Sequence, residues 1–367
     1  MRDRDRYFFE RAVRLAYMGM GKTSPNPSVG CVIVKDGEIV GEGYHIYAHE
    51  DHAEVVALKM AGNRAKGSIM YVTLEPCFHH GRTPPCVDRI IETGIKRVVV
   101  GMMDPNPLVS GKSIEKLRKN GITVDVLGSH KRLESLNEDF FKFIVKKIPF
   151  VAIKVALTLD GKLATTSGNS KWITGDKARK YTHFLRYRYN SILVGVNTIL
   201  KDNPLLTCRY KKKKGVPFYR FVIDPHLKIP ASARIFSEGG EEQPIVIFTG
   251  GDVGHGEISK KCKIISIPQD GGRLDLYAIL KEIAGLGVSS VLVEGGSFTI
   301  SEFIKYGFVD KIHIFFAPKL LGDGISFYNA KKDILKMEDA LKLKFICSKN
   351  FGEDVLLNYY FNHRRGG

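Results

Sequence analysis

Residues 75–86 read Glu-Pro-Cys-Phe-His-His-Gly-Arg-Thr-Pro-Pro-Cys, and about 20 residues upstream the chain reads His52-Ala-Glu54. Zinc prefers imidazole and thiolate ligands, and a catalytic zinc takes three from the protein and leaves the fourth position to water, whose pKa it lowers. Glu54 is placed to move the proton of that water. Zinc deaminases carry H-x-E followed by P-C-x-x-C, and here eight residues separate the cysteines. We therefore predict a catalytic zinc held by His52, Cys77 and Cys86.

Two other interpretations of these residues remain open. In the first, the zinc site is closed and structural, with His79 or His80 as the fourth ligand, which would leave Glu54 without a chemical task. In the second, Cys77 and Cys86 are unrelated buried thiols.

The segments around this motif alternate between helical and strand patterns. Asp36-Gly37 between two strand-like runs is a strong hairpin signal. Alternating strands and helices predict an α/β layered domain. The expected elements are helices at 5–18, 53–60, 87–93 and 113–119 and strands at 29–34, 38–44, 69–74, 97–101 and 123–126. A long helix over 131–146 closes this half, and Pro149, which cannot continue a helix, marks a boundary.

The second half repeats the α/β pattern. Its expected elements are a helix near 176–188 and strands at 150–157, 191–194, 218–224, 245–248, 288–293, 342–347 and 354–360. One strand end runs into Glu294-Gly295-Gly296 and a further helix. Glycines at such a turn let backbone N–H groups approach a phosphate, although a plain tight turn fits as well. The G-x-G-x-x-G fingerprint of a Rossmann unit is absent.

Length and composition are those of a globular protein. The chain has 367 residues, enough for two domains, with 44% apolar and 26% charged residues. No apolar run reaches the roughly 18 residues of a membrane span, and no signal peptide is recognisable. We therefore expect a cytoplasmic protein. The six cysteines are scattered, unlike a disulfide framework, so we expect reduced thiols, with Cys31 in the core.

The formal net charge of +17 is high. Such an excess attracts anions, either phosphorylated metabolites or nucleic acid. A lysine-rich solvated surface explains the charge equally well. The run from Lys211 to Lys214 is expected to be a loop, since four like charges repel one another.

Eight motifs along the chain occur in one combination. Those of the first half are Thr-Ser-Pro-Asn-Pro-Ser-Val-Gly (23–30), His-Ala-Glu (52–54), the 75–86 stretch and Asp-Pro-Asn-Pro (104–107). Those of the second half are Lys-Val-Ala-Leu-Thr-Leu-Asp-Gly-Lys (154–162), Ser-Lys-Trp-Ile-Thr (170–174), Asp-Asn-Pro (202–204) and Val-Glu-Gly-Gly (293–296). In this combination the chain resembles the bacterial bifunctional riboflavin-biosynthesis deaminase/reductases over nearly its whole length.

The resemblance implies a zinc-dependent pyrimidine deaminase domain at 1–147 and an NADPH-dependent reductase domain at 148–367. The first fold would resemble cytidine deaminase, an α/β/α layer, and the second dihydrofolate reductase. The first domain would convert 2,5-diamino-6-ribosylamino-4(3H)-pyrimidinone 5′-phosphate to 5-amino-6-(5-phosphoribosylamino)uracil. The second would reduce the ribosyl chain to ribityl with NADPH. The resemblance also implies a homo-oligomer, a dimer or tetramer, that binds phosphorylated pyrimidines and neither membrane nor nucleic acid.

The resemblance further assigns residues to each site. The deaminase substrate would contact Asn26, His45, His79, Arg82, Asp104 and Asn106. The reductase substrate would contact Ser170, Arg186, Leu206, Arg209 and Glu294. NADPH would contact Ala156, Trp172, Thr198, Asp202, Gly295 and Gly296. Lys154 would position the ribose carbonyl. Read singly, these residues also fit ordinary loop or surface positions, and Trp172 also fits a core position.

Two further functional hypotheses remain at this point. One is a zinc deaminase that acts on a nucleoside or on nucleic acid, with a non-catalytic C-terminal binding module, as the positive charge suggests. The other is a zinc-stabilised scaffold without activity. The eight-residue cysteine spacing and the motifs beyond residue 150 favour the bifunctional enzyme.

Overall fold

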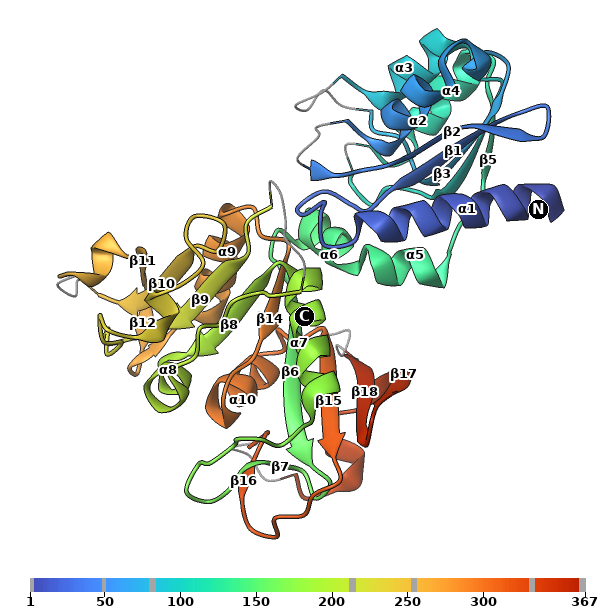
Figure 1. Cartoon of the computed structure of the whole chain (residues 1–367). Coiled ribbons are helices and arrows are strands. Elements are labelled where there is room, and N and C mark those ends of the chain that lie inside the picture. Colours follow the sequence, from blue (N-terminus) through green and yellow to red (C-terminus); the bar gives the residue numbers. More distant parts are fainter. Residues whose placement is uncertain are drawn as a thin grey trace. The chain divides into compact units, whose positions relative to one another are not determined.

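The computed structural model describes residues 3–47, 51–78, 84–107, 109–210, 216–251, 256–329 and 334–362. The chain divides into two compact units, and the boundary between them along the chain falls between Lys147 and Ile148 (Figure 1). Each unit has a central sheet with helices on both faces. The predicted α/β class is therefore confirmed for both halves.

The sheet of the first unit has five strands in the order β2-β1-β3-β4-β5. β1 and β2 form an antiparallel hairpin around Asp36-Gly37, as the turn signal predicts, while β3, β4 and β5 run parallel. Their bounds are β1 Gly30–Lys35, β2 Glu38–Tyr44, β3 Ile69–Leu74, β4 Arg97–Met102 and β5 Thr123–Val126. Because β3 and β4 are parallel neighbours, the segments that follow Leu74 and Met102 emerge at the same sheet edge.

Helices cover both faces of this sheet. α1 and α5 lie on one face, and α2, α3 and α4 lie on the other (Figure 1). The Tyr17 hydroxyl of α1 donates to the Arg132 carbonyl of α5, and Arg132 pairs with Glu10 of α1. The bounds are α1 Asp3–Gly19, α2 Ala53–Ala61, η2 Gly62–Ala65, α3 Cys86–Thr93, α4 Lys112–Lys119, α5 Lys131–Leu136 and α6 Glu138–Lys146.

Two glycines of β2 allow α2 to lie directly against the strand. A Cβ at Gly41 would lie 2.2 Å from the Ala57 carbonyl oxygen, and a Cβ at Gly43 would lie 2.3 Å from that of Ala53. No side chain fits in such a gap, so backbone packs on backbone. Since α2 begins next to His52, this contact sets where the predicted metal ligand stands over the sheet.

Replacing Gly43 by alanine is expected to push α2 away from β2. Overpacking of this kind costs about 1–3 kcal/mol, and the shift should also weaken zinc binding because His52 moves with the helix. Unfolding curves and zinc content of the purified protein measure both effects. Gly285→Ala is the matched control, since its Cβ would meet nothing within 4 Å. Equal behaviour of the two variants would contradict the packing argument.

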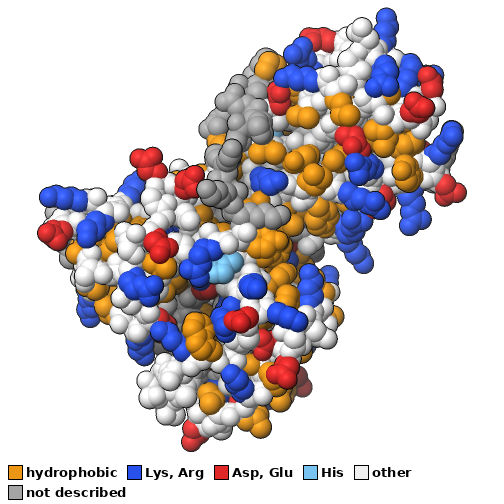
Figure 2. Space-filling model, in the orientation of Figure 1, with side chains coloured by type: hydrophobic (Ala, Val, Ile, Leu, Met, Phe, Trp, Pro, Cys, Tyr) orange, Lys and Arg blue, Asp and Glu red, His pale blue; other side chains and the backbone are white. Residues whose placement is uncertain are grey.

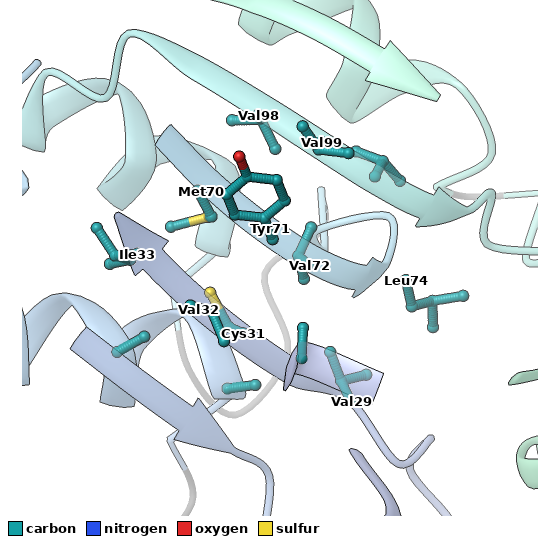
Figure 3. Packing of buried hydrophobic residues seen from close by; sticks show 14 of the residues in the cluster. Val29, Cys31, Val32, Ile33, Met70, Tyr71, Val72, Leu74, Val98 and Val99 are labelled. Atoms are coloured by element: carbon teal, nitrogen blue, oxygen red, sulfur yellow. The ribbon is translucent and has the colours of Figure 1, made fainter. Parts of the chain in front are cut away.

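The core of the first unit, between its sheet and the helices on both faces, is apolar. Figure 3 shows Val32 and Tyr71 from adjacent strands, together with Cys31 and Val72, and these four side chains are buried. Cys31 is paired with Gly43, which faces α2, and with Val72. Because paired positions point to the same face of a sheet, Cys31 and Val72 lie on the α2 side. The predicted core position of Cys31 is thus confirmed. All six cysteines are free thiols, as expected.

The prediction of one long helix over 131–146 is wrong. The structure breaks it at Asn137 into α5 and α6. The Asn137 side chain accepts from the Ser28 N–H at 2.7 Å and donates to the Ser28 carbonyl at 3.1 Å. An asparagine side chain that hydrogen-bonds the backbone of a distant segment can interrupt a helix. The apolar periodicity of the residues on either side of Asn137 does not reveal this break.

The second unit has a nine-stranded sheet in the order β11-β10-β9-β8-β14-β6-β15-β18-β17. The first seven strands in this order, from β11 through β6 to β15, run parallel. The last two, β18 and β17, are each antiparallel to the strand before them in the sheet. The bounds are β6 Phe150–Thr158, β8 Ser191–Gly195, β9 Tyr219–Ile223, β10 Ile245–Gly250, β11 Lys263–Ile267, β14 Ser290–Val293, β15 Lys311–Ala317, β17 Leu343–Phe351 and β18 Asp354–Phe361. Short pairs join β7 Lys162–Ala164 to β16 Ile325–Ser326 and β12 Gln269–Asp270 to β13 Arg273–Leu274.

Helices again cover both faces. Val151 and Ile153 of β6 share one cluster with α9 and α10, whereas Phe150 and Ala152 share another with α7. Side chains alternate along a strand, so these clusters lie on opposite faces. The bounds are α7 Asp176–Tyr189, α8 Val196–Asp202, η3 Arg234–Phe236, η4 Ile258–Lys260, α9 Leu276–Gly285, α10 Ser297–Lys305 and η5 Met337–Asp339.

The net positive charge comes from 56 lysine and arginine residues against 39 aspartate and glutamate residues. On the face that Figure 2 shows, lysine and arginine side chains are scattered over both units. The Lys211–Lys214 run lies outside the described residues. Among the described residues, no helix is both long and apolar enough to cross a lipid bilayer.

Candidate functional site

Three short elements bring the predicted metal ligands together. His52 is the residue immediately before α2, Cys77 follows the end of β3, and Cys86 opens α3. The backbone N–H of Cys86 donates to the Cys77 sulfur at 3.1 Å. The segments on either side of 79–83 are thereby tied to each other at the ligand positions.

The geometry of these ligands fits a zinc ion. The His52 Nδ1 atom lies 3.2 Å from the Cys86 sulfur and 3.4 Å from the Cys77 sulfur. All three ligand atoms lie within 4.8 Å of one another. A tetrahedral zinc with ordinary Zn–N and Zn–S bonds separates nitrogen from sulfur by roughly 3.5 Å. The donor set and its two nitrogen–sulfur distances therefore match those expected for zinc.

The His52 ring and the Cys77 thiol shift each other's pKa in the directions that favour a thiolate beside a protonated imidazole. Hydrogen bonds from Cys86 and His52 lower the pKa of the Cys77 thiol, despite burial. The hydrogen bond to Cys77 raises the pKa of His52 to about 9. Binding of a dication would replace the shared protons, since zinc takes thiolate and neutral imidazole as ligands.

Glu54 is buried beside the ligands and is only 3% exposed. It lies in the first turn of α2, beside the Cys86 side chain. Burial raises the pKa of its carboxyl, which favours uptake of a proton. A carboxyl with a raised pKa beside a candidate metal site has the properties of a group that takes and returns protons during a reaction.

Asn26 and His45 form a short hydrogen-bond chain next to the ligands. The His45 Nδ1 atom lies 3.0 Å from the Asp51 carbonyl oxygen and donates to it, so Nε2 accepts from the Asn26 amide at 3.1 Å. Burial lowers the pKa of His45 to about 4, so the ring is neutral. Its edge meets His52, with ring centroids 5.1 Å apart. The structure thus brings both predicted contacts to the metal ligands.

Asp104 and Asn106 follow β4 at the same sheet edge. The Asn106 N–H donates to the Asp104 carboxylate at 2.8 Å, and both residues are buried. Burial raises the pKa of Asp104 to about 6. The Glu75 carboxylate accepts from the Asp104 N–H at 3.3 Å. Glu75 is a residue that the sequence interpretation missed, although it stands two positions before a predicted ligand.

Two predicted substrate contacts, His79 and Arg82, lie outside the described residues. His80, the other candidate for a fourth zinc ligand, lies outside them too. The assignments of these three residues therefore stay predictions.

A buried ionic cluster marks the second unit. Arg186 of α7 forms a two-pronged ion pair with Glu294 at the end of β14, at 2.7 and 3.0 Å, and also donates to the Thr207 carbonyl. Burial raises the pKa of Glu294, but Arg186 and Lys154 outweigh it, and the net pKa lies below the usual range. Burial lowers the pKa of Lys154. Two cations and one carboxylate thus share a desolvated space, which is typical of a functional site.

A histidine extends this cluster towards the loop after α8. The side-chain Nη2 of Arg209 lies 3.2 Å from the His183 Nε2 atom on α7. Burial, together with Arg186 and Arg209, lowers the pKa of His183 to about 4, so it is neutral and can accept. Leu206 is buried in the same loop. The structure therefore unites Lys154, Arg186, Arg209 and Glu294, and adds His183, which the sequence interpretation missed.

The predicted cofactor contacts gather at the carboxyl ends of the parallel strands. Gly295 and Gly296 lie between β14 and α10, Thr198 and Asp202 belong to α8, and Ala156 lies on β6. A Cβ at Gly295 would lie 2.8 Å from the Thr299 Cβ, whereas a Cβ at Gly296 would meet nothing. A helix N-terminus with open space before it suits a phosphate.

Ser170 and Trp172 stand on the loop before α7. Trp172 is 65% exposed, so the alternative of a core tryptophan is wrong. Its ring lies under the Arg179 guanidinium, 4.4 Å from it, and its carbonyl accepts from Lys319. An exposed, oriented ring at this place remains available to a ligand.

Two family models match the chain. One, described as the cytidine and deoxycytidylate deaminase zinc-binding region, matches residues 2–102, and the other, described as the RibD C-terminal domain, matches residues 149–357. The chain is 45% identical to the riboflavin biosynthesis protein RibD of Aquifex aeolicus over 97% of its own length and 98% of that protein. It is 39% identical to RibD of Escherichia coli, over 96% and 98% of the two chains.

Solved structures agree with these relatives. Acinetobacter baumannii RibD matches with a TM-score of 0.87 and 33% identity, covering 98% of this chain and 99% of that one. A Thermotoga maritima diaminohydroxyphosphoribosylaminopyrimidine deaminase/5-amino-6-(5-phosphoribosylamino)uracil reductase matches with a TM-score of 0.85 and 37% identity over the same shares. The similarity thus extends across both units.

Proposed function

Because the chain belongs to the RibD family of riboflavin biosynthesis proteins, with deaminase and reductase activities in one polypeptide, we propose that its first unit is a zinc-dependent deaminase and its second an NADPH-dependent reductase. The proposed boundary between the two domains is at residues 147 and 148. The observation that carries the proposal is the trio of ligand atoms within 4.8 Å, next to a buried glutamate.

The first unit would act on 2,5-diamino-6-ribosylamino-4(3H)-pyrimidinone 5′-phosphate. Zinc, held by His52, Cys77 and Cys86, would act as a Lewis acid that makes water nucleophilic at neutral pH. Glu54 would take one proton from the attacking water and pass it to the adjacent ring nitrogen, and it would then move the second proton of the same oxygen to the departing amine. The C–O bond forms, the C–N bond breaks, and ammonia leaves.

The residues around the metal would hold the pyrimidine and its phosphate. The amide of Asn26 offers a donor and an acceptor for the edge of the base, His45 would hold that amide against the bound pyrimidine, and Asp104 with Asn106 offers a second set. By their likeness to the family, His79 and Arg82 would join them, and an arginine can bind phosphate through two parallel hydrogen bonds.

The second unit would reduce the ribosyl chain of the deaminated product. NADPH would supply the hydride, as expected for a cofactor-dependent reductase. Lys154, whose pKa burial lowers, would hold the oxygen of the ribose carbonyl and deliver a proton to it. Arg186 and Glu294 would hold the substrate, with Ser170, Leu206 and Arg209 around it. Ala156, Trp172, Thr198, Asp202, Gly295 and Gly296 would hold the cofactor.

Removal of zinc is expected to separate the two activities. A chelator such as 1,10-phenanthroline should abolish ammonia release, and added zinc should restore it, because only the first unit holds the predicted ligand trio. NADPH oxidation with 5-amino-6-(5-phosphoribosylamino)uracil should continue unchanged. Ammonia assays and the loss of NADPH absorbance would follow the two reactions. Ammonia release that survives complete metal removal would contradict the zinc proposal.

We further propose that the protein works in the cytoplasm as a dimer or tetramer. Its six free thiols suit a reducing compartment. Light scattering coupled to gel filtration would give the oligomeric state, and a single-chain mass would contradict this part of the proposal.

A further inference from the structure

Glu75 links the metal site to the loop that carries Asp104 and Asn106. It is 3% exposed and stands between β3 and the ligand Cys77. Its Oε2 atom accepts from the Asp104 N–H at 3.3 Å and from the Gly111 N–H at 3.0 Å. One carboxylate oxygen therefore holds both ends of the segment from Asp104 to Gly111.

The segment that Glu75 holds is also organised internally. The Asn106 N–H donates to Asp104, and the Asn106 carbonyl accepts from Val109 and Ser110 at 2.8 and 2.9 Å. Its position relative to the sheet, however, comes from contacts outside it. The Glu75 N–H donates to the carbonyl of Met102, the last residue of β4, at 2.8 Å, so the backbone of Glu75 is fixed to the strand from which this segment departs.

The connection from Glu75 to the metal ligand is short and stiff. A single residue, Pro76, separates Glu75 from Cys77, and its ring restricts the backbone. The Pro76 carbonyl accepts from the Ser113 hydroxyl at 2.6 Å, which ties the same point to α4. Any displacement of the Glu75 carboxylate is thus a displacement of Asp104 and Asn106 relative to the metal site.

We propose that Glu75 is a positioning residue for the deaminase, which sets Asp104 and Asn106 at the right distance from the metal for the pyrimidine. The proposal rests on the deaminase function proposed above. Geometry, not charge, carries it, because both N–H groups use Oε2 while Oε1 has no hydrogen-bond partner among the described residues. A neutral amide oxygen could accept the same two bonds.

Two variants separate geometry from charge. Glu75→Gln keeps the length and an acceptor oxygen but removes the charge, whereas Glu75→Asp keeps the charge but is one methylene too short. We expect Glu75→Gln to keep the KM of the deaminase substrate within about threefold of the parent value, and Glu75→Asp to raise it by about tenfold or more with a smaller change in kcat. Both variants should retain zinc and unchanged NADPH-dependent reduction of the deaminated substrate.

The possible results distinguish failure of the Glu75 proposal from failure of the deaminase proposal. If Glu75→Gln is the weaker enzyme and Glu75→Asp the normal one, charge is the function of Glu75 and the proposal is wrong. Loss of zinc from Glu75→Asp, or an equal KM in both variants, would overturn it as well. Glu115→Ala, on the exposed face of α4, is the control and should behave like the parent. If the parent protein itself releases no ammonia, the deaminase proposal fails instead.

Discussion

Replacing Glu54 by glutamine is expected to abolish ammonia release without loss of zinc. The amide keeps the size of the side chain and its place beside Cys86, but it cannot take a proton from water. Loss of a general acid/base costs about 10²–10⁴-fold in rate, and because this one group serves several proton transfers we place the effect at the upper end. Single-turnover ammonia release and metal analysis of the same preparation measure both parts.

The same chain supplies the control for this variant. Reduction of 5-amino-6-(5-phosphoribosylamino)uracil with NADPH should proceed at the parent rate in Glu54→Gln, since the second unit contains none of the altered chemistry. Cys77→Ser should differ, losing zinc together with ammonia release. A Glu54→Gln protein that still deaminates at the parent rate would contradict the role of Glu54 as the proton carrier.

Replacing Glu294 by glutamine is expected to impair the reductase activity and to leave the deaminase activity intact, the reverse of the result expected for Glu54→Gln. The change leaves Arg186 and Lys154 buried without their counter-charge, and removing one partner of a buried ion pair costs about 3–5 kcal/mol. The pair is well buried, with side-chain exposures of 13% and 12%. NADPH oxidation should fall by about 10²-fold or more, since substrate and ion cluster share this space. Ammonia release should remain.

A second ion pair of the same unit gives the matched comparison for Glu294→Gln. Glu302 of α10 pairs with Arg273 at 2.9 Å, and Arg273 is 39% exposed. Glu302→Gln should cost no more than about 1 kcal/mol and leave both activities intact. Urea unfolding of the two variants compares their stabilities. If both variants lost reductase activity equally, general destabilisation would explain the result and the specific role of Glu294 would be refuted.

The metal ligands could be predicted from the sequence because zinc chemistry admits few residue types. His52, Cys77 and Cys86 are the side chains it requires, and the structure brings them together. The hairpin at Asp36-Gly37 was equally predictable, since positive φ values at both positions favour these residues. The reductase contacts came instead from resemblance, because a hydride-transfer site needs no reactive side-chain pair that a pattern would reveal.

Glu75 and His183 could not be predicted, because their roles depend on partners distant in sequence. Glu75 bonds backbone groups 29 and 36 positions away, and His183 contacts a loop 26 positions away. Such pairings exist only after the parallel strands have aligned. The one signal available for Glu75 was its place directly before Pro76 and Cys77.

The strand β15 was missed for a related reason. Its sequence places Lys311 and His313 among apolar residues, which obscures a buried strand. Both are buried in the structure, where His313 bonds the Tyr189 hydroxyl at 2.8 Å and Lys311 lies over the Tyr360 ring. Polar side chains satisfied by tertiary partners break the apolar pattern on which strand prediction depends.

Asn137 has a mechanical consequence for the enzyme. Its two hydrogen bonds fasten the corner between α5 and α6 to Ser28, two residues from Asn26. α6 ends at Lys146, and the chain then enters the second unit. A pull on this connector would therefore reach the loop of Asn26, a proposed pyrimidine contact, through one amide side chain.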